Sequence, residues 1–558
     1  MDYSEKRRLL FLAKQDLTDV HAVAEGGDAG HVRGDLAAGI QAFDGFIVGI
    51  EHAIAIVIEQ TAAGDMGGNR ARAGIERCLV HRAERREGNP SEVLIQIIGC
   101  VGVVLLDGGG EHLRVHAELL CQILDRVRAE ELTLGDHLLH VEAVEGLAIA
   151  GCGSRGLNTY ATCQEKFPER MQIVAAADSK PERLAIMKKQ FGLTDGQCYP
   201  SAEAMLAQPK LADAMFICTG DRMHYAQTMA ALEKGYHVLL EKPIAPTGEE
   251  CRDIERLAGE KRLQVVVCHV LRYTIFYQKL KELLDRRVIG DVVSVQAIEK
   301  VAYWHQAHSF VRGNWRSAQE STPMILQKCC HDMDILLWLT GKRCVGVSSY
   351  GSLTLFREEN APAGAPMRCT EPCPAADTCP YNAVRFYLDR VKRGDCGWPV
   401  DVLQHEPTEE NILQSLKTGP YGRCVYRCDN DVVDHQVVNL LLEGGTTVSF
   451  TMCAFTADGG REMRIMGTMG EILGDVHAKR IVVRPFGGEE QVIDVGQLTD
   501  DFSGHEGGDA RMIEDFLRLL GGETVSGSVT TIGRSVESHL VALAAERSRL
   551  HGGEAVTL

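Results

Sequence analysis

The sequence contains no apolar run long enough to span a membrane. The longest candidate, Val93–Leu106, is too short and is interrupted by Gln96, Gly99 and Gly102. Excess positive charge is also missing, because 59 Lys and Arg face 77 Asp and Glu, and the formal net charge of −18 argues against a nucleic-acid-binding surface. The first residues lack the apolar core of a signal peptide, so we expect a cytoplasmic protein without membrane or nucleic-acid partners.

Lysine, tryptophan and proline are scarce in the N-terminal part. No lysine occurs between Lys14 and Lys166, and within residues 1–143 tryptophan is absent and Pro90 is the only proline. A chain of 558 residues is long enough for two or three domains. Residues 1–143 are either an additional domain of α/β character or an extension not under selection for folding, for example because the start codon is placed too early. We favour the extension, since the segment that follows is complete without it.

A glycine-rich segment near residue 150 indicates a nucleotide-binding site. Leu147–Ala150 is a short apolar run typical of a buried parallel strand, and glycines follow it in the spacing G-x-G-x-x-G. The first glycine permits a tight turn, the second lets the backbone approach a pyrophosphate, and the third lets the next helix pack closely. Asp178 ends the next apolar run, where a carboxylate accepts from a ribose 2′-hydroxyl and repels a 2′-phosphate, which favours NAD over NADP. The predicted cofactor-binding residues here are Gly151, Gly153, Ser154, Arg155, Gly156 and Asp178.

Strand and helix patterns alternate from residue 144 to about residue 271, which predicts a parallel, doubly wound α/β sheet. We expect strands at 144–150, 173–178, 214–219, 237–240 and 264–270, and helices at 155–166, 181–191, 201–206, 225–234 and 248–261. Ligands of such a sheet gather at the carboxyl ends of its strands. Those ends carry Thr219 and the tripeptide Glu241-Lys242-Pro243.

From residue 272 the strands no longer alternate with crossover helices, which predicts an α+β domain with a large open, mainly antiparallel sheet. Its strands are expected at 292–302, 344–355, 437–455, 462–466 and 480–484, and its helices at 276–287, 510–520 and 533–549. The predicted organisation is an N-terminal extension at 1–143, a Rossmann domain at 144–271, and a substrate and oligomerisation domain at 272–558 with a Cys-rich insertion at 356–431.

Six short motifs occur in order between residues 151 and 341. They are Gly151–Gly156, Thr219–His224, His237–Pro243, Arg272-Tyr273, Gly313–Arg316 and Cys330–Gly341. Together they resemble the glucose–fructose oxidoreductase / inositol dehydrogenase (Gfo/Idh/MocA) family, over roughly residue 145 to the C-terminus. The resemblance implies a Rossmann domain with an open-sheet domain, NAD(P)-linked oxidation or reduction of sugars, cyclitols or glycosides, and homodimers or homotetramers packed through the open sheet. Within these motifs, cofactor binding is also predicted for Thr219, His224, Glu241 and Lys242.

The resemblance implies two catalytic residues, Lys242 and His331. Lys242 looks like the lysine that contacts both nicotinamide and the reacting hydroxyl, and His331 looks like the acid/base histidine. An imidazole titrates near pH 6.5, which suits proton transfer near neutrality, and burial beside a cationic nicotinamide would lower the pKa of a lysine. We expect the two to act together and leave open which takes the proton first. Gln327 stands where the family commonly has an aspartate, and Asp334 matches a family aspartate three residues after the histidine.

Substrate contacts are predicted around His331. The flat rings of Trp304 and Trp315 suit sugar rings, and His305 and Arg316 could bind hydroxyls or carboxylates; packing on the sheet face is an equal alternative. Two further residues directly follow a strand end. The predicted substrate-binding residues are Arg272, Tyr273, Trp304, His305, Trp315, Arg316, Gln327, Lys328 and Asp334.

Five cysteines cluster in the insertion. Their spacing is C-x₃-C-x₅-C followed by C-x₃-C, in a segment rich in Pro, Gly and charge with little sheet pattern. Such a segment lacks a core and would gain from a structural zinc held by four thiolates. An iron–sulfur cluster and five free thiols are the alternatives. The candidate ligands are Cys369, Cys373, Cys379, Cys424 and Cys428.

These observations predict an NAD-dependent dehydrogenase that moves a hydride between a secondary hydroxyl of a small carbohydrate-like substrate and nicotinamide. Two alternatives stay open. One is a redox-neutral glycoside hydrolase in which NAD remains bound, and the other is a non-enzymatic nucleotide-binding protein. Net production of NADH distinguishes the first prediction from the second.

Overall fold

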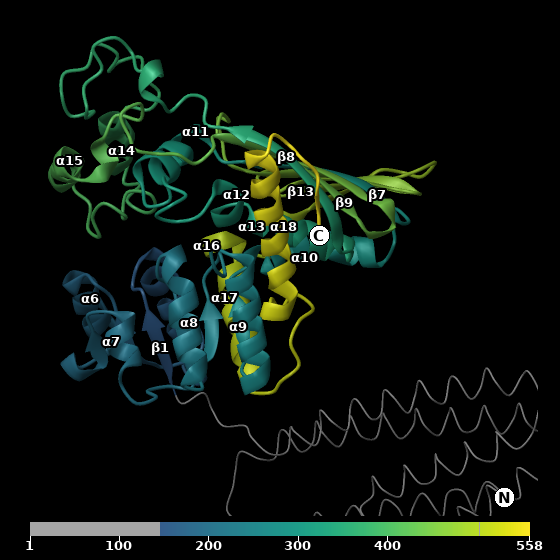
Figure 1. The fold of residues 1–558 in the computed structure, drawn as a ribbon, viewed down its shortest axis with the longest axis horizontal. Helices are drawn as coiled ribbons and strands as arrows, with labels where there is room; N and C mark the ends of the chain where they lie inside the picture. Colours follow the sequence, from purple (N-terminus) through teal and green to yellow (C-terminus); the bar gives the residue numbers. More distant parts are fainter. Residues whose placement is uncertain (1–145, 502) are drawn as a thin grey trace, which may run out of the picture. The chain divides into compact units, whose positions relative to one another are not determined.

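The computed structural model describes residues 146–501 and 503–558 (Figure 1). The expectation for residues 1–143 lies outside these residues. Two sheets make up the described part, and each carries one of the two predicted domains. No helix of this described part is long and apolar enough to cross a membrane.

The first sheet is the predicted doubly wound sheet. Its six strands pair in the order β3-β2-β1-β4-β5-β6, and every pairing is parallel. The order reverses between β1 and β4, and ligands of such sheets bind in the crevice at this point. The strands are β1 (Leu147–Ala150), β2 (Ile173–Ala177), β3 (Cys198–Tyr199), β4 (Ala214–Ile217), β5 (His237–Leu240) and β6 (Val265–Val267).

Helices follow the strands of this sheet where the sequence predicts them. The chain after β1 forms two short helices, η1 and η2, before β2. The Ser201 hydroxyl caps α7 by accepting from the amide of Ala204, and the predicted bounds of α6, α9 and β5 are confirmed. The helices are η1 (Ser154–Tyr160), η2 (Ala161–Glu165), α6 (Pro181–Phe191), α7 (Ala202–Leu206), α8 (His224–Glu233) and α9 (Gly248–Lys261).

The second sheet has nine strands in the order β14-β13-β12-β11-β7-β10-β9-β8-β15. In the described structure β7 and β10 pair in parallel and the other neighbours are antiparallel, so the expectation of a mainly antiparallel sheet is confirmed. The strands are β7 (Val292–Lys300), β8 (Cys344–Ser352), β9 (His435–Leu442), β10 (Thr447–Cys453), β11 (Gly460–Gly467), β12 (Gly470–Asp475), β13 (Arg480–Pro485), β14 (Gln491–Asp494) and β15 (Val556–Thr557).

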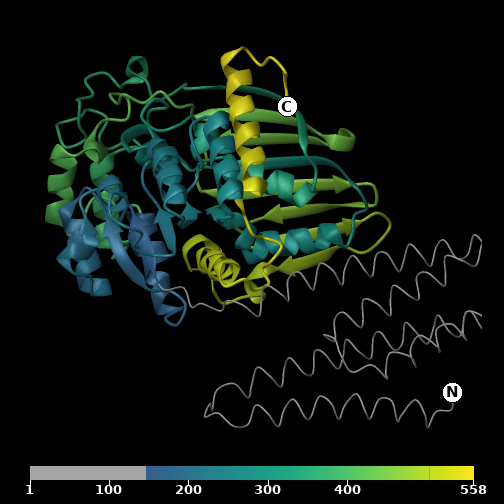
Figure 2. The same ribbon diagram turned by 60° about the horizontal axis from the view of Figure 1, so that its bottom comes forward.

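Three helices cover one face of the large sheet: α10 (Ile275–Asp285), α13 (Cys330–Thr340) and α18 (Ile532–Leu550). Their apolar side chains form one core with the alternate, inward-facing residues of the strands, as the burial pattern of β9 and β10 shows. Figures 1 and 2 show the yellow helix α18 lying along the same face as α10. Side chains of the active-site helix α13 are therefore held between the sheet and α18.

The C-terminal helix α17 (Gly508–Leu520) packs on the Rossmann sheet instead of the large sheet. Met512, Ile513 and Phe516 share a core with Leu147 and Phe216. The chain thus returns to the first domain before α18 and β15 complete the second. The domain boundary at 271/272 stays a prediction.

The insertion at 356–431 has more structure than expected. It contains α14 (Ala383–Lys392) and α15 (Glu409–Thr418), and Tyr387, Ile412 and Leu416 form part of a small apolar core of its own. The prediction that this segment lacks a core is therefore wrong, because its few apolar residues are spaced for helices. Further short helices are η5 (Val270–Tyr273), α11 (Tyr303–His305), η6 (Gln306–Arg312), α12 (Met324–Gln327) and α16 (Ser503–Glu506).

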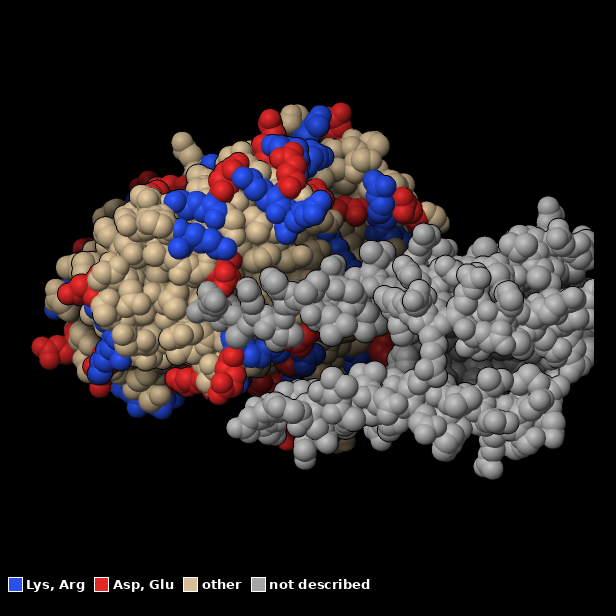
Figure 3. Space-filling model, turned by 90° about the horizontal axis from the view of Figure 1, so that it is seen from below, with Lys and Arg blue, Asp and Glu red and all other residues tan. Residues whose placement is uncertain are grey.

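On the face drawn in Figure 3, Lys and Arg side chains are interspersed with Asp and Glu side chains. Many of these charges form ion pairs, such as Arg256 with Glu260 and Lys281 with Asp285. Exposed pairs of this kind contribute little to stability.

Candidate active site

The glycine-rich loop has the geometry of a dinucleotide site. Gly151 has φ +89°, and a Cβ there would lie 2.5 Å from the carbonyl oxygen of Cys218. A Cβ on Gly156 would overlap the carbonyl oxygen of Gly151. At Gly153, by contrast, the nearest described atom to a Cβ is 3.6 Å away, on Arg183. The protein itself requires the first and third glycines, whereas at the second a Cβ would meet only the Arg183 guanidinium at ordinary contact distance, so the fold alone does not demand this glycine. Close approach of a pyrophosphate would demand it.

Asp178 lies at the carboxyl end of β2, beside this loop. Its carboxylate accepts from the backbone amides of Cys152 and Lys180, both at 2.8 Å, and Arg183 of α6 lies 3.3 Å away. These bonds orient the carboxylate toward the site where a ribose would lie. Arg183 is a residue that sequence reasoning missed, and it adds a cation next to the predicted ribose ligand.

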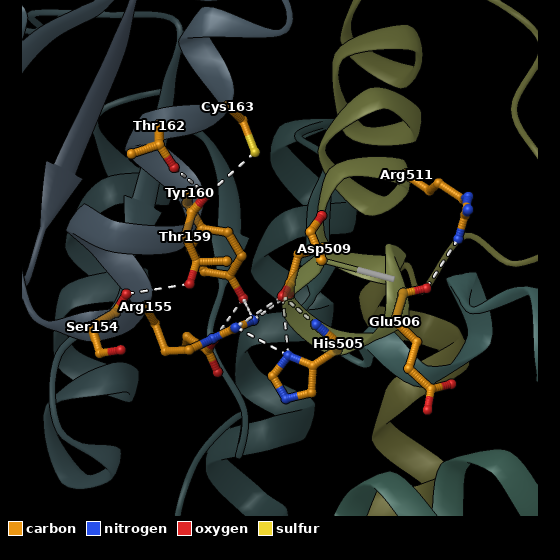
Figure 4. Close-up of polar contacts among 12 residues, drawn as sticks. Ser154, Arg155, Thr159, Tyr160, Thr162, Cys163, His505, Glu506, Asp509 and Arg511 are labelled. Carbon is orange, nitrogen blue, oxygen red and sulfur yellow. Dashed lines mark hydrogen bonds and ion pairs between the residues drawn. The ribbon is translucent and has the colours of Figure 1, made fainter. Parts of the chain in front are cut away.

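Arg155 and Glu241, both predicted to bind the cofactor, bind each other. Figure 4 shows Arg155 beside Tyr160 and Asp509. The Arg155 guanidinium donates to Glu241 at 2.7 Å and to Asp509 of α17 at 2.6 Å. Tyr160 donates its hydroxyl to the same Glu241 oxygen at 2.6 Å. Burial favours protonated Asp509, but the charge of Arg155 outweighs it and holds the pKa of this carboxyl well below its usual range. The network joins the glycine loop, the end of β5 and α17. No sequence motif predicted that Asp509 takes part in this network.

The loops after β4 and β5 are also fastened to each other. His224 places its ring nitrogens 2.7 Å from the carbonyl oxygen of Pro243 and 3.1 Å from that of Thr219. The Thr219 hydroxyl donates to Gln227 at 2.6 Å. Both side chains, predicted to bind the cofactor, therefore hold the two loops in place, while Ser154 is exposed at the glycine loop.

Lys242 reaches from the Rossmann domain to the helix pair that carries His331. It follows β5, and its Nζ donates to the backbone oxygen of Gln327 at 2.9 Å. Gln327 ends α12, and His331 is the second residue of α13, which comes next. Burial lowers the pKa of His331 well below its usual value, and the charge of Lys242 lowers it further. The imidazole is therefore neutral at neutral pH and can accept a proton.

His331 has a second histidine behind it. The ring of His269, which follows β6, lies 5.6 Å from the ring of His331 and 5.3 Å from the ring of His539 in α18. His269 is fully buried, and its Nε2 is 4.0 Å from the carboxylate of Asp334. Neither nitrogen of His269, nor Nδ1 of His331, has a hydrogen-bond partner among the described residues. The sequence places His269 at the end of a strand, where ligands of such a sheet gather, but no local pattern predicts that its ring lies beside that of His331.

Three predicted substrate-binding residues are bonded to other groups of the protein. Arg272 and Asp334 form a buried bidentate ion pair, with bonds of 2.7 and 2.6 Å. Tyr273 is 1% exposed, and its hydroxyl lies 3.1 Å from the amide of Thr530. Each of these side chains has its polar atoms satisfied inside the protein, and its substrate-binding role stays a prediction.

The neutral side chain of Gln327 connects the segments at Trp315 and Ser321. Its amide donates to the backbone oxygen of Trp315 at 2.9 Å and accepts from Ser321 at 3.2 Å. Its neighbour Lys328 is paired with buried Glu299 of β7 at 2.9 Å. Lys328 therefore does not substitute for the carboxylate that the family commonly has at position 327.

The remaining predicted residues lie where the insertion meets the second domain. Arg316 pairs with Asp429 at 2.9 Å, which fastens the end of the insertion. The indole nitrogen of Trp315 lies 3.4 Å from Asp221, the carboxylate that follows β4. Trp304 and His305 stack on each other, with ring centroids 5.7 Å apart.

The cysteines of the insertion do not form a recognisable metal site. In residues 146–501 and 503–558, no group of three Cys, His, Asp or Glu side chains is placed to hold a metal ion. Cys369, Cys373, Cys379, Cys424 and Cys428 are all free thiols. Cys369 instead accepts from Arg312 at 3.7 Å. The structural zinc expected from the spacing is not supported, since the insertion has an apolar core in its place.

Both domains match models of known families. The model described as "Oxidoreductase family, NAD-binding Rossmann fold" matches residues 146–269, and the "GFO/IDH/MocA C-terminal domain" matches residues 277–473. The chain belongs to the GFO/IDH/MocA family. It is an oxidoreductase with an NAD-binding domain, and the resemblance drawn from the six motifs is confirmed.

Several members of this family are similar to the chain. The Bacillus subtilis protein named as an oxidoreductase, YteT, is 24% identical over 67% of this chain and 89% of its own length. Inositol 2-dehydrogenase of Pseudomonas fluorescens is 27% identical over 40% of this chain and 61% of its own length. D-glucoside 3-dehydrogenase of Escherichia coli is 30% identical, but the match spans 22% of this chain and 34% of that enzyme.

A solved structure has the same fold. The WlbA dehydrogenase of Chromobacterium violaceum, in complex with NADH and UDP-GlcNAcA, superposes with a TM-score of 0.54 at 18% identity. The match covers 75% of this chain and 97% of that chain. The two-domain architecture is thus shared across strongly diverged sequences.

Proposed function

We propose that this oxidoreductase moves a hydride between a secondary hydroxyl of a sugar, cyclitol or glycoside and NAD. The observation that carries the proposal is the bond from Lys242 Nζ to the backbone oxygen of Gln327, one helical turn before His331. An ammonium and a neutral imidazole from different domains thereby face one site. Relatives named as inositol and D-glucoside dehydrogenases support the substrate class.

The residues fit a bound dinucleotide. Gly151, Gly153 and Gly156 would hold the pyrophosphate, and Asp178 would accept from the ribose 2′-hydroxyl. Bound NAD supplies the acceptor for the hydride. Because Arg183 stands beside Asp178, the preference for NAD over NADP is expected to be moderate.

His331 and Lys242 together carry out the transfer of the substrate's hydroxyl proton. Lys242 donates a hydrogen bond to the substrate oxygen and stabilises the negative charge that develops there as the O–H proton leaves, before the hydride departs from carbon. His331 accepts the hydroxyl proton at Nε2, since its Nδ1 is buried and has no hydrogen-bond partner among the described residues. His269, with Asp334 and Arg272 behind it, keeps the imidazole ring in place. Burial keeps His331 neutral and ready to accept.

The test compares Lys242→Met and His331→Asn with the control Lys261→Met, whose side chain is on the outside of α9. Each active-site variant should lose about 10² to 10⁴ in kcat on a panel of sugars, cyclitols and glycosides, with NAD binding retained. NADH absorbance reports turnover, and calorimetry reports NAD binding. Wild-type turnover by Lys242→Met would remove the proposed mechanism.

The open face of the large sheet supports the proposed homodimer or homotetramer. Its central rows are Ser294, Thr447 and Leu441, then Gln296, Ser449 and Asn439, then Ile298, Thr451 and Val437. These nine side chains carry no charge, and Leu441 and Val437 are 46% and 38% exposed. An uncharged sheet face of this kind suits contact with a second copy.

A further inference from the structure

The insertion contributes an exposed tryptophan, Trp398, which has no stacked aromatic partner among the described residues. Trp398 is 42% exposed, although large aromatic residues are usually more deeply buried. Its described ring neighbours meet it at an angle: Trp304 at 55°, His305 at 79° and His308 at 81°. None of these three contacts is face to face. The flat faces of the indole therefore have no stacking partner in the described structure.

The neighbouring Trp304 differs from Trp398, because its indole has a stacked partner. Phe386 stacks on it at 26° with centroids 5.7 Å apart, and the Arg390 guanidinium lies 5.0 Å from its ring centre. Trp304 thus joins the insertion to α11. Trp398 contacts the same joint through Trp304, His305 and His308, but no ring stacks on it face to face and part of the indole stays exposed.

A row of rings leads from Trp398 to the active site. His305 lies 4.9 Å from Trp398, Phe310 lies 5.5 Å from His305, and Trp315 lies 6.4 Å from Phe310. Trp315 is 37% exposed, so the row has an exposed indole at each end. Its inner end is anchored by Gln327, which donates to the Trp315 backbone.

The row is also close to the catalytic lysine. Gln327, which holds Trp315, is the residue whose backbone oxygen receives Lys242. Burial lowers the pKa of His305 well below its usual value, and the charges of Lys328 and Lys242 lower it further. His305 therefore lies within electrostatic reach of Lys242, with Trp398 on its other side.

We propose that Trp398 forms a second ring-binding subsite, which holds a pyranose ring linked through a glycosidic bond to the sugar that is oxidised at Lys242 and His331. This inference rests on the proposed function and narrows its substrate class to glycosides with a sugar as the second ring. The C–H face of a pyranose is apolar and flat, and it stacks on an exposed indole. Free monosaccharides and cyclitols would leave Trp398 uncovered.

The test uses pairs of probes that share the same reacting ring. Methyl glucoside is compared with cellobiose and maltose, and methyl galactoside with lactose. In the wild type we expect kcat/KM to be about tenfold higher for one of the disaccharides than for its methyl glycoside, and Trp398→Ala should remove this advantage. Trp398→Phe, which keeps a ring, should retain part of it. The control is Phe486→Ala, which removes a 66% exposed ring after β13 in the large sheet.

Binding measured without turnover separates the two proposals. Calorimetry on the NADH-loaded protein should show the same disaccharide advantage, lost in Trp398→Ala. Such binding without NAD reduction would keep the subsite and refute the proposed function. Equal losses on both members of a pair, a changed KM for NAD alone, or no disaccharide advantage in either assay would each overturn the subsite.

Discussion

Buried histidines should make this protein sensitive to mild acid. Burial lowers the pKa of His269, His305, His308, His331 and His539, to about 3 for His308 and His539. In the unfolded chain each would titrate near about 6.5. Above that pH both states are neutral, so the histidines add no pH dependence. As the pH falls below it, the unfolded state takes up protons that the folded state cannot.

The size of the effect follows from linkage. At pH 5.5 an unfolded histidine is protonated about ten to one, which lowers the free energy of unfolding by about 1.4 kcal/mol for each residue that stays neutral when folded. Five such residues would remove about 7 kcal/mol, compared with a total of about 5–15 kcal/mol for a typical domain. The carboxyl groups of Asp509 and Asp429, whose pKa is lowered, titrate below this window. Burial raises the pKa of Asp332, Asp334 and Glu506, so these groups contribute with the opposite sign, and the comparison of a histidine variant with the wild type cancels them.

The assay is urea unfolding at pH 7.5 and 5.5, followed by circular dichroism. His539→Gln should lose about 1.4 kcal/mol less stability than the wild type between these two pH values, whatever its stability at pH 7.5. His477→Gln serves as the control, because the side chain of His477 is 64% exposed. If the histidine in α18 can be replaced without changing the pH dependence, the assignment of a neutral buried imidazole is refuted.

Three further predictions test individual residues. Asp178→Ala removes the carboxylate but leaves Arg183, so the ratio of kcat/KM for NAD to that for NADP should fall about tenfold or more; an unchanged ratio contradicts the ribose assignment. Gly153→Ala should weaken NAD binding in calorimetry without changing the melting temperature, whereas Gly156→Ala should lower the melting temperature. The reverse pattern would contradict this distinction between the two glycines. Tyr273→Phe should lower the free energy of unfolding by about 1 kcal/mol in urea and leave the sugar KM unchanged. A raised sugar KM would show instead that Tyr273 contacts the substrate.

The doubly wound domain could be predicted almost completely from the chain. The bounds of α6, β5 and α9 follow from local features: a proline at the first helical position, a run of apolar residues and a capping box at Thr247. These signals lie within a few residues of each other, so they can be recognised without knowledge of the fold. The second sheet was harder. Strands β12 and β14 were missed because β14 has only four residues and because Gly470 and Gly474 weaken the strand pattern of β12.

The sequence by itself determined the family and the glycine loop, and it supplied the proposals that Asp178 binds the ribose and that Lys242 and His331 act together. These depend on motifs whose spacing carries the chemistry. Only the tertiary structure decided which polar side chains are bonded to other groups of the protein. Arg155 meets Asp509 and Arg272 meets Asp334 across long stretches of chain, and the insertion forms an apolar core where its cysteines suggested zinc. Partners so distant in the sequence leave no local pattern, because the chain brings them together only when both sheets are packed.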